Sequence, residues 1–77
     1  MDARALLLYK HCLQALGIDQ TKLTEEALEK YRTCCKIIVR VNLEAEFDQL
    51  CDRCMKAFNF LTENPEANLP AANFIID

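Results

Sequence analysis

No glycine or proline occurs between Thr24 and Glu63, so this long stretch lacks the two residues that most readily break a helix. Apolar residues recur through it at intervals of three and four, which is the spacing of an amphipathic helix. Such a stretch can form one long helix or two helices that pack against each other. One long helix would predict an obligate dimer, because a partner chain would have to cover its apolar stripe.

The phase of the apolar pattern favours two helices. The step from Ile38 to Leu43 is five residues, which would carry the stripe around the side of a straight helix. Asn42 lies at this slip, and we expect helices of about 25–41 and 43–63 that meet there. The two apolar stripes comprise Leu28, Tyr31, Cys35 and Ile38, then Leu43, Phe47, Leu50, Cys54, Ala57 and Leu61.

Charged residues on the two predicted helices match if the chain folds back at Asn42. Basic side chains spaced four apart would then face acidic side chains spaced four apart. Exposed ion pairs each contribute only about 0.2–1 kcal/mol, so these pairs would set the register more than the stability. The same register places Cys35 opposite Leu50. The predicted pairs are Arg40 with Glu44, Lys36 with Asp48, and Arg32 with Asp52.

A further helix of about 3–16 is predicted before the long stretch. Gly17 follows it and can adopt the left-handed conformation that commonly ends helices. Thr24 is placed to cap the next helix, whose first turn carries Glu25 and Glu26 at the positive end of the helix dipole. The expected fold is therefore all-α, a small antiparallel three-helix bundle with an extended C-terminal tail. The apolar face of the first helix comprises Ala5, Leu6, Tyr9, Cys12, Leu13 and Leu16.

The end of the chain differs in character from the predicted bundle. Residues 1–67 are expected to form one helical domain, and residues 68–77 an apolar tail. Burying a large apolar side chain is worth roughly 1.5–3 kcal/mol, so the tail is interpreted as a lid over the bundle, a segment that docks on a partner or a second copy, or a link to a further domain. Together with a basic stripe on the second helix, it is assigned to partner binding. The assigned residues are Leu69, Phe74, Ile75, Ile76, Arg32, Lys36 and Arg40.

Charge and hydropathy narrow the class of partner. The formal net charge is −3, with 9 Lys and Arg against 12 Asp and Glu, which disfavours nucleic acid as a partner. No apolar run approaches the roughly 20 residues of a membrane span, and no secretory signal pattern follows Met1. We expect an intracellular protein, cytoplasmic or nuclear, that binds another protein or a second copy of itself, including as a homodimer, and does not bind a membrane.

Five cysteines, including the CxxC pair Cys51 and Cys54, are the most distinctive feature of the composition. An odd number of cysteines in a reducing compartment disfavours a disulfide framework. Cysteine is among the most often buried residue types, so we interpret the thiols as core residues and expect no cofactor. A structural zinc site is the alternative, although its adjacent pair departs from the usual CxxC spacing. That site would comprise Cys34, Cys35, Cys51 and Cys54.

The sequence brings together no set of groups for catalysis. His11 is the lone histidine and the chain has no serine, which excludes a serine-nucleophile triad. Glu25, Glu26 and Glu29 are interpreted as the solvated first turn of a helix. The prediction is a non-enzymatic protein-interaction or oligomerisation module, an adaptor or scaffold domain that binds a helical or extended peptide of a partner. A small cysteine-ligated zinc domain is the alternative.

Three short segments resemble parts of known helical families. "ALLLYKHCLQALG" and "LTEEALEKYRTCC" resemble the antiparallel helices of MIT domains, and "NFLTENPEAN" resembles the close of a tetratricopeptide repeat. Each resemblance covers about one helix. The repeat pattern departs at Arg53 and Phe60, which would occupy its small-residue positions. Both resemblances imply helical hairpins, and no functional residue is carried over from either family.

Overall fold

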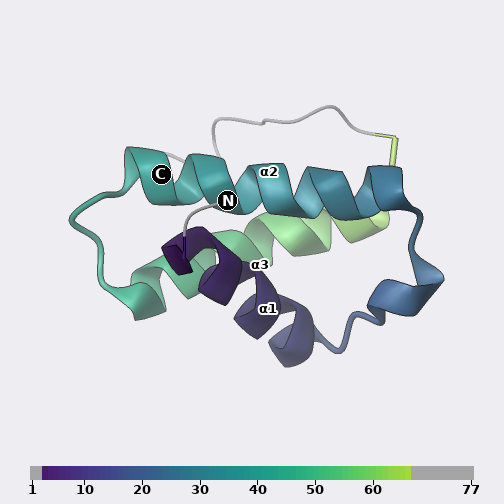
Figure 1. Cartoon of the computed structure of the whole chain (residues 1–77), viewed down its shortest axis with the longest axis horizontal. Coiled ribbons are helices and arrows are strands. Elements are labelled where there is room, and N and C mark those ends of the chain that lie inside the picture. Colours follow the sequence, from purple (N-terminus) through teal and green to yellow (C-terminus); the bar gives the residue numbers. More distant parts are fainter. Residues whose placement is uncertain (1–2, 67–77) are drawn as a thin grey trace.

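The computed structural model describes residues 3–66, which form an all-α bundle (Figure 1). Helices α1 (Ala3–Leu16), α2 (Glu25–Val41) and α3 (Phe47–Glu63) each contact the other two, and a short 3-10 helix, η1 (Gln20–Lys22), lies between α1 and α2. In Figure 1, α2 and α3 lie side by side and run in opposite directions. The predicted three-helix bundle is therefore confirmed, and no strand occurs within the described range.

The first two helices begin and end at residues with clear local causes. Gly17 has a φ of 68°, and the backbone N–H of Ile18 donates to the Leu13 carbonyl at 2.9 Å, which closes the end of α1. Thr24 caps α2, because its hydroxyl accepts a hydrogen bond from the backbone N–H of Ala27 at 3.1 Å. The predicted bounds of these two helices agree with the structure.

The third helix begins at Phe47, four residues later than the pattern predicted. Glu46 and Gln49 form a capping box, in which each side chain accepts a hydrogen bond from the backbone N–H of the other residue. Residues 42–46 form the connection between α2 and α3, which excludes a single helix over 24–63. We call this segment the α2–α3 connection. The connection gives the chain enough residues to reverse direction between the two helices, which a turn at a single residue would not.

This connection shifts the register of α2 against α3 by about one helical turn. Cys35 contacts Cys54 with a sulfur–sulfur distance of 3.4 Å, so it does not lie opposite Leu50. Tyr31 likewise meets Phe58, four residues beyond the position that the predicted register places opposite it, with ring centroids 4.6 Å apart. The predicted register was wrong because it assigned almost no residues to the turn. None of the predicted ion pairs forms: Arg40 with Glu44, Lys36 with Asp48, or Arg32 with Asp52.

The core lies along the axis where the three helices meet. It confirms most of the predicted apolar positions, but Leu6 and Leu43 are exposed rather than buried. Leu8 takes the inward position on α1, and Phe58 supplies the largest fully buried side chain. All five cysteines are buried. The buried residues are Ala5, Leu8, Tyr9, Cys12, Leu13, Tyr31, Cys34, Cys35, Ile38, Val39, Leu50, Cys51, Cys54, Ala57, Phe58 and Leu61.

Candidate functional site

The α2–α3 connection is held firmly at both of its ends. The backbone N–H and the side-chain amide of Asn42 both donate to the Ile38 carbonyl, at 3.2 and 2.9 Å. The backbone N–H of Ala45 donates to the Asn42 carbonyl at 3.0 Å, and the capping box at Glu46 follows directly. Because its backbone groups are paired in this way, the connection presents its side chains from a defined conformation.

Arg4 ties the first turn of α1 to this connection. Its Nη1 donates to the Leu43 carbonyl at 3.3 Å, and its Nη2 donates to the Ala45 carbonyl at 2.7 Å. One planar guanidinium therefore donates to the carbonyls of two residues of the connection, which suits its fixed arrangement of N–H donors. The start of α1 and the connection are thereby joined at one end of the bundle (Figure 1).

Exposed apolar side chains gather where Arg4 makes this joint. Leu43 on the connection is 70% exposed, and Leu7 on α1 is 59% exposed. Within the described residues, every exposed large hydrophobic side chain lies in the first two turns of α1 or between the last residue of α2 and the connection. We call this set the apolar end: Leu6, Leu7, Val41 and Leu43.

An aromatic contact borders the apolar end. The His11 ring meets the Phe47 ring edge to face, with centroids 5.7 Å apart. His11 lies one turn beyond Leu7 on α1, and Phe47 is the first residue of α3. The contact therefore joins α1 to the start of α3, next to the joint made by Arg4, and gives the otherwise exposed His11 a packing role.

The basic stripe of α2 divides into a paired part and an unpaired part. Arg32 forms ion pairs with Glu29, at 2.8 Å, and with Glu25, both on its own helix. The Arg32 guanidinium lowers the pKa of Glu29, and Glu29 and Glu25 raise the pKa of Arg32. Lys36 and Arg40 form no ion pair within the described chain. Of the predicted stripe, two of three cations therefore remain available.

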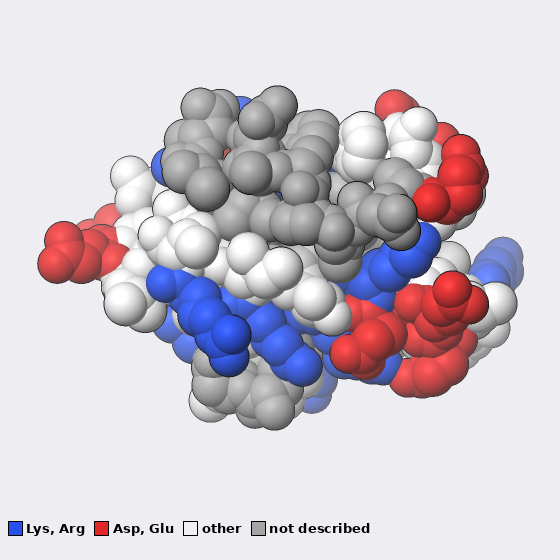
Figure 2. All heavy atoms as spheres, turned by 90° about the horizontal axis from the view of Figure 1, so that it is seen from above, with Lys and Arg blue, Asp and Glu red and all other residues white. Residues whose placement is uncertain are grey.

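Charge is segregated along α2 as a result. Figure 2 views the bundle from the α2 side, with basic side chains gathered over its middle and acidic ones at both ends, the larger acidic group lying at one of them. This larger acidic group corresponds to the first turns of α2, which carry Glu25, Glu26 and Glu29. Arg40 immediately precedes Val41, so the basic half of α2 leads into the apolar end.

Arg4→Ala is expected to lower the free energy of unfolding by about 1–2 kcal/mol, since two charge-assisted hydrogen bonds to backbone carbonyls are lost. Arg4→Lys is the matched control, because it keeps the charge but not the two-pronged fork. It should recover only part of the loss. Urea titration followed by circular dichroism measures both. Equal stability of the alanine variant and the parent would show that Arg4 does not hold the connection.

Three buried thiols, one from each helix, meet in the core. Cys54 on α3 contacts Cys35 on α2 and is hydrogen-bonded to Cys12 on α1. The Cys12 thiol also approaches the Cys51 carbonyl at 4.0 Å. The hydrogen bond between Cys12 and Cys54 lowers the pKa of Cys12 and raises the pKa of Cys54. This thiol cluster comprises Cys12, Cys35 and Cys54.

These thiols do not form the zinc site that the sequence offered as an alternative. Within residues 3–66, no group of three or more His, Cys, Asp or Glu side chains has an arrangement that could hold a metal ion. The adjacent residues Cys34 and Cys35 project in different directions around α2, and Cys35 alone makes the contact with Cys54. The four proposed ligands, Cys34, Cys35, Cys51 and Cys54, therefore do not converge.

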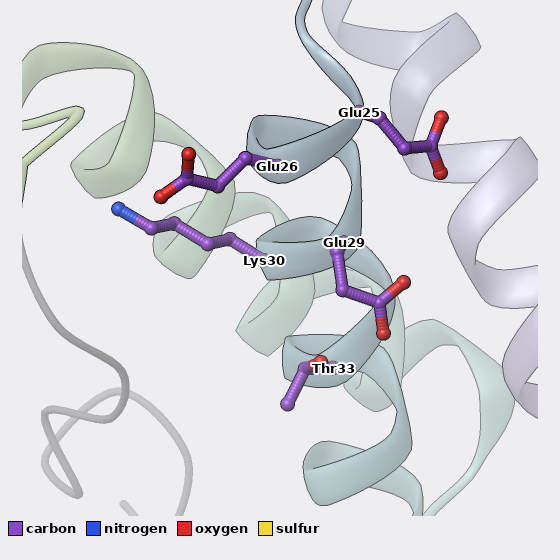
Figure 3. Close-up of a pocket in the computed structure, with 5 residues that line it drawn as sticks. All are labelled: Glu25, Glu26, Glu29, Lys30 and Thr33. Atoms are coloured by element: carbon purple, nitrogen blue, oxygen red, sulfur yellow. The ribbon is translucent and has the colours of Figure 1, made fainter.

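Two hollows lie near the start of α2. The larger, of about 400 Å³, is open and lined by Glu25, Glu26, Glu29, Lys30 and Thr33 (Figure 3). Glu26 and Lys30 point to one side of the helix in this view, whereas Glu25 points to the other. The carboxylates thus diverge, as expected for a solvated first turn.

The smaller hollow, of about 110 Å³, lies between the start of α2 and the end of α3. Two interactions across it join the helices at this end. The hydroxyls of Tyr31 and Thr62 are 3.0 Å apart, and Lys30 Nζ donates to the Pro65 carbonyl at 2.7 Å. Because its polar groups already bind one another, this hollow has a structural role.

The remaining predicted site residues, Leu69, Phe74, Ile75 and Ile76, lie outside the described residues. No helix among residues 3–66 combines the length and the apolarity needed to cross a bilayer. Comparison of the chain with models of protein families, with curated proteins and with solved structures found no match.

Sequence reasoning did not find the apolar end. A signal for it was present, because Leu6, Leu7 and Leu8 are consecutive and successive helical side chains are turned by about 100°. Three such residues cannot all face one core, so at least one had to be exposed. Arg4 gave no such signal, since its two acceptors are backbone carbonyls some forty residues away along the chain.

Proposed function

We propose that this chain is a non-enzymatic protein-interaction module that binds a short segment of a partner protein at the apolar end. The observation that carries the proposal is that the exposed large hydrophobic side chains of residues 3–66 lie on the first two turns of α1, the last residue of α2 and the connection that Arg4 joins to α1. Scattered exposed leucines are ordinary, whereas a group of them on an ordered surface marks an interaction site.

The energetics suit a peptide-sized partner. Burying a leucine side chain is worth roughly 1.5–3 kcal/mol, and Leu7 and Leu43 have most of that stabilisation still to gain. The connection is already ordered by hydrogen bonds, so binding of a partner would lose less conformational entropy than binding to a disordered segment would. We therefore assign Leu7 and Leu43 as the anchor residues.

The unpaired cations indicate the chemistry of the partner. Lys36 and Arg40 lie on the half of α2 that leads into the apolar end, and neither forms an ion pair among residues 3–66, although the charge of Lys36 contributes to lowering the pKa of Glu29. A segment with apolar anchors flanked by Asp or Glu would complement both features. Arg32 is assigned a smaller role, because Glu25 and Glu29 already neutralise it.

Two further observations support the proposal. The open hollow in Figure 3 joins three carboxylates, one amine and one hydroxyl, with no enclosed cavity around them, which favours a role other than catalysis. All five cysteines are free, as a reducing compartment would maintain them, which favours the cytoplasm or nucleus.

The test is selection of binders from a displayed library of random short peptides, followed by affinity measurement on the selected peptides. We expect apolar residues flanked by carboxylates to be enriched. Leu7→Glu with Leu43→Glu should reduce affinity at least tenfold, because the anchors are lost and a carboxylate faces the acidic peptide. Gln14→Glu is the control for the charge that Leu7→Glu adds, since it places one carboxylate two turns along the same face of α1.

Two results would overturn the proposal. In the first, the selected peptides bind the Leu7→Glu and Leu43→Glu double variant as tightly as the parent. In the second, sedimentation equilibrium shows a dimer of this chain that the double variant dissociates. The second result would assign the apolar end to a second copy of the chain in place of a partner peptide.

A further inference from the structure

The thiol cluster holds two sulfurs in contact on facing helices. Cys35 Sγ on α2 and Cys54 Sγ on α3 are 3.4 Å apart, and neither residue has any exposed surface. A disulfide bond has a length of about 2.05 Å, so the two sulfurs would have to approach by about 1.4 Å.

We propose that Cys35 and Cys54 form an oxidation site, at which a hydroperoxide converts two buried thiols into a disulfide that joins α2 to α3. This inference is independent of the proposed binding function. The bond would close a loop that contains the whole α2–α3 connection, because that connection lies between the two cysteines in the sequence. Oxidation would thus restrain the two helices that carry the connection.

The reaction balances in two steps. One thiolate of the pair attacks a peroxide oxygen, the O–O bond breaks, and a sulfenic acid and water form after proton transfer. The second thiol then attacks the sulfenic sulfur, an S–S bond forms, and a second water leaves. Two thiols lose two electrons and two protons, and hydrogen peroxide is reduced to two molecules of water.

Burial determines when this site reacts. Reagents reach a fully buried thiol only when the structure opens, and a small single domain opens locally and globally from time to time. The pair should therefore respond to sustained oxidant rather than to a brief pulse. Cys12 is the competing partner for Cys54, since the two are hydrogen-bonded, and its lowered pKa favours its thiolate.

Tryptic cleavage can identify the bond, because it separates most of the cysteines. Cys12, Cys51 and Cys54 each fall in a different tryptic peptide, and Cys34 and Cys35 share the peptide 33–36. The folded protein is treated with hydrogen peroxide, the remaining thiols are alkylated in denaturant, and non-reduced peptides are analysed by mass spectrometry. We expect a loss of two hydrogen atoms and a link between peptide 33–36 and peptide 54–56.

Single variants distinguish the two cysteines that share a peptide. Cys35→Ala should abolish the link, whereas Cys34→Ala, which alters an equally buried neighbour on the same helix, should retain it. Circular dichroism before oxidation establishes that each variant is folded. If Cys35→Ala does not fold, fragmentation of the linked peptide 33–36 between its two cysteines distinguishes Cys34 from Cys35 in the parent protein.

Three outcomes in the folded protein would overturn the proposal: no disulfide in the parent, a link from Cys54 to the peptide of Cys12, or a link that persists in Cys35→Ala. A sample oxidised in urea is the control for pairing that depends on the fold. A link between peptides 33–36 and 54–56 that is equally abundant in urea would also overturn it, because contact in the folded core would then not be its cause.

Discussion

Phe58→Ala is expected to lower the free energy of unfolding by about 3–5 kcal/mol, the range for phenylalanine-to-alanine changes in protein cores. Phe58 is the largest fully buried side chain, and its ring packs edge to face on Tyr31. Removing the ring loses both the apolar burial and this aromatic contact. Since domains of this size have a small margin of stability, a large part of the population should unfold at 25 °C.

Urea titration at several temperatures, followed by circular dichroism, measures this loss. Phe60→Ala is the matched control, because Phe60 lies on the same helix and is only half-buried. It should cost less than half as much. Equal losses for the two variants would contradict the placement of Phe58 at the centre of the core.

Alkaline pH is expected to destabilise the protein through its buried thiols. Burial raises the pKa of Cys34 from 9.0 to about 12 and the pKa of Cys51 from 9.0 to about 11. The unfolded chain loses these protons near pH 9, so it gains stability relative to the folded chain as the pH rises above that value. The contribution of each thiol is complete below pH 9 and is lost progressively up to its folded pKa.

The size of this effect follows from about 1.4 kcal/mol for each pKa unit. Together the two thiols should reduce the free energy of unfolding by about 3–5 kcal/mol between pH 8 and pH 11. Urea midpoints across this range measure the slope. The double variant Cys34→Ala and Cys51→Ala is the control, and its slope should be markedly shallower. Parallel slopes for parent and variant would show that other groups cause the alkaline loss.

The helix ends that the sequence predicted correctly have local causes. Gly17 ends α1 through its own φ angle, and Thr24 caps α2 through its own hydroxyl group. Each acts on residues one turn away, so its effect can be predicted from the sequence. The start of α3 was missed because Glu46 caps it through a reciprocal capping box, and glutamate is not a common cap. Leu43 also continued the apolar pattern, although the chain there is not helical.

The register of α2 against α3 depends on how many residues the connection consumes. A pattern of matched charges cannot supply that number, because exposed ion pairs are too weak to override the packing of buried side chains. Contacts such as Tyr31 with Phe58 and Cys35 with Cys54 fix the register from inside the core. Arg32 then pairs within its own helix, with Glu25 and Glu29.

The candidate site was predictable only in part. The stripe that includes Lys36 and Arg40 was identified from its spacing, and both remain unpaired within the described chain. The apolar end was not identified, because its residues come from α1 and from a segment far along the chain. A single arginine, Arg4, joins these two segments. The thiols were correctly interpreted as core residues, and Cys12 does lie beside Cys54 as antiparallel packing of α1 implies.

The joint made by Arg4 has a consequence for how this surface can diverge. Both of its acceptors are backbone carbonyls, which every amino acid carries, so these hydrogen bonds do not depend on which side chain stands at the exposed position 43, whereas Ala45 packs against the core. Position 43 can therefore change its residue while the backbone beneath it stays in place. Related chains could acquire different binding preferences there at little cost in stability, and the same property makes position 43 a suitable place to graft a new recognition residue.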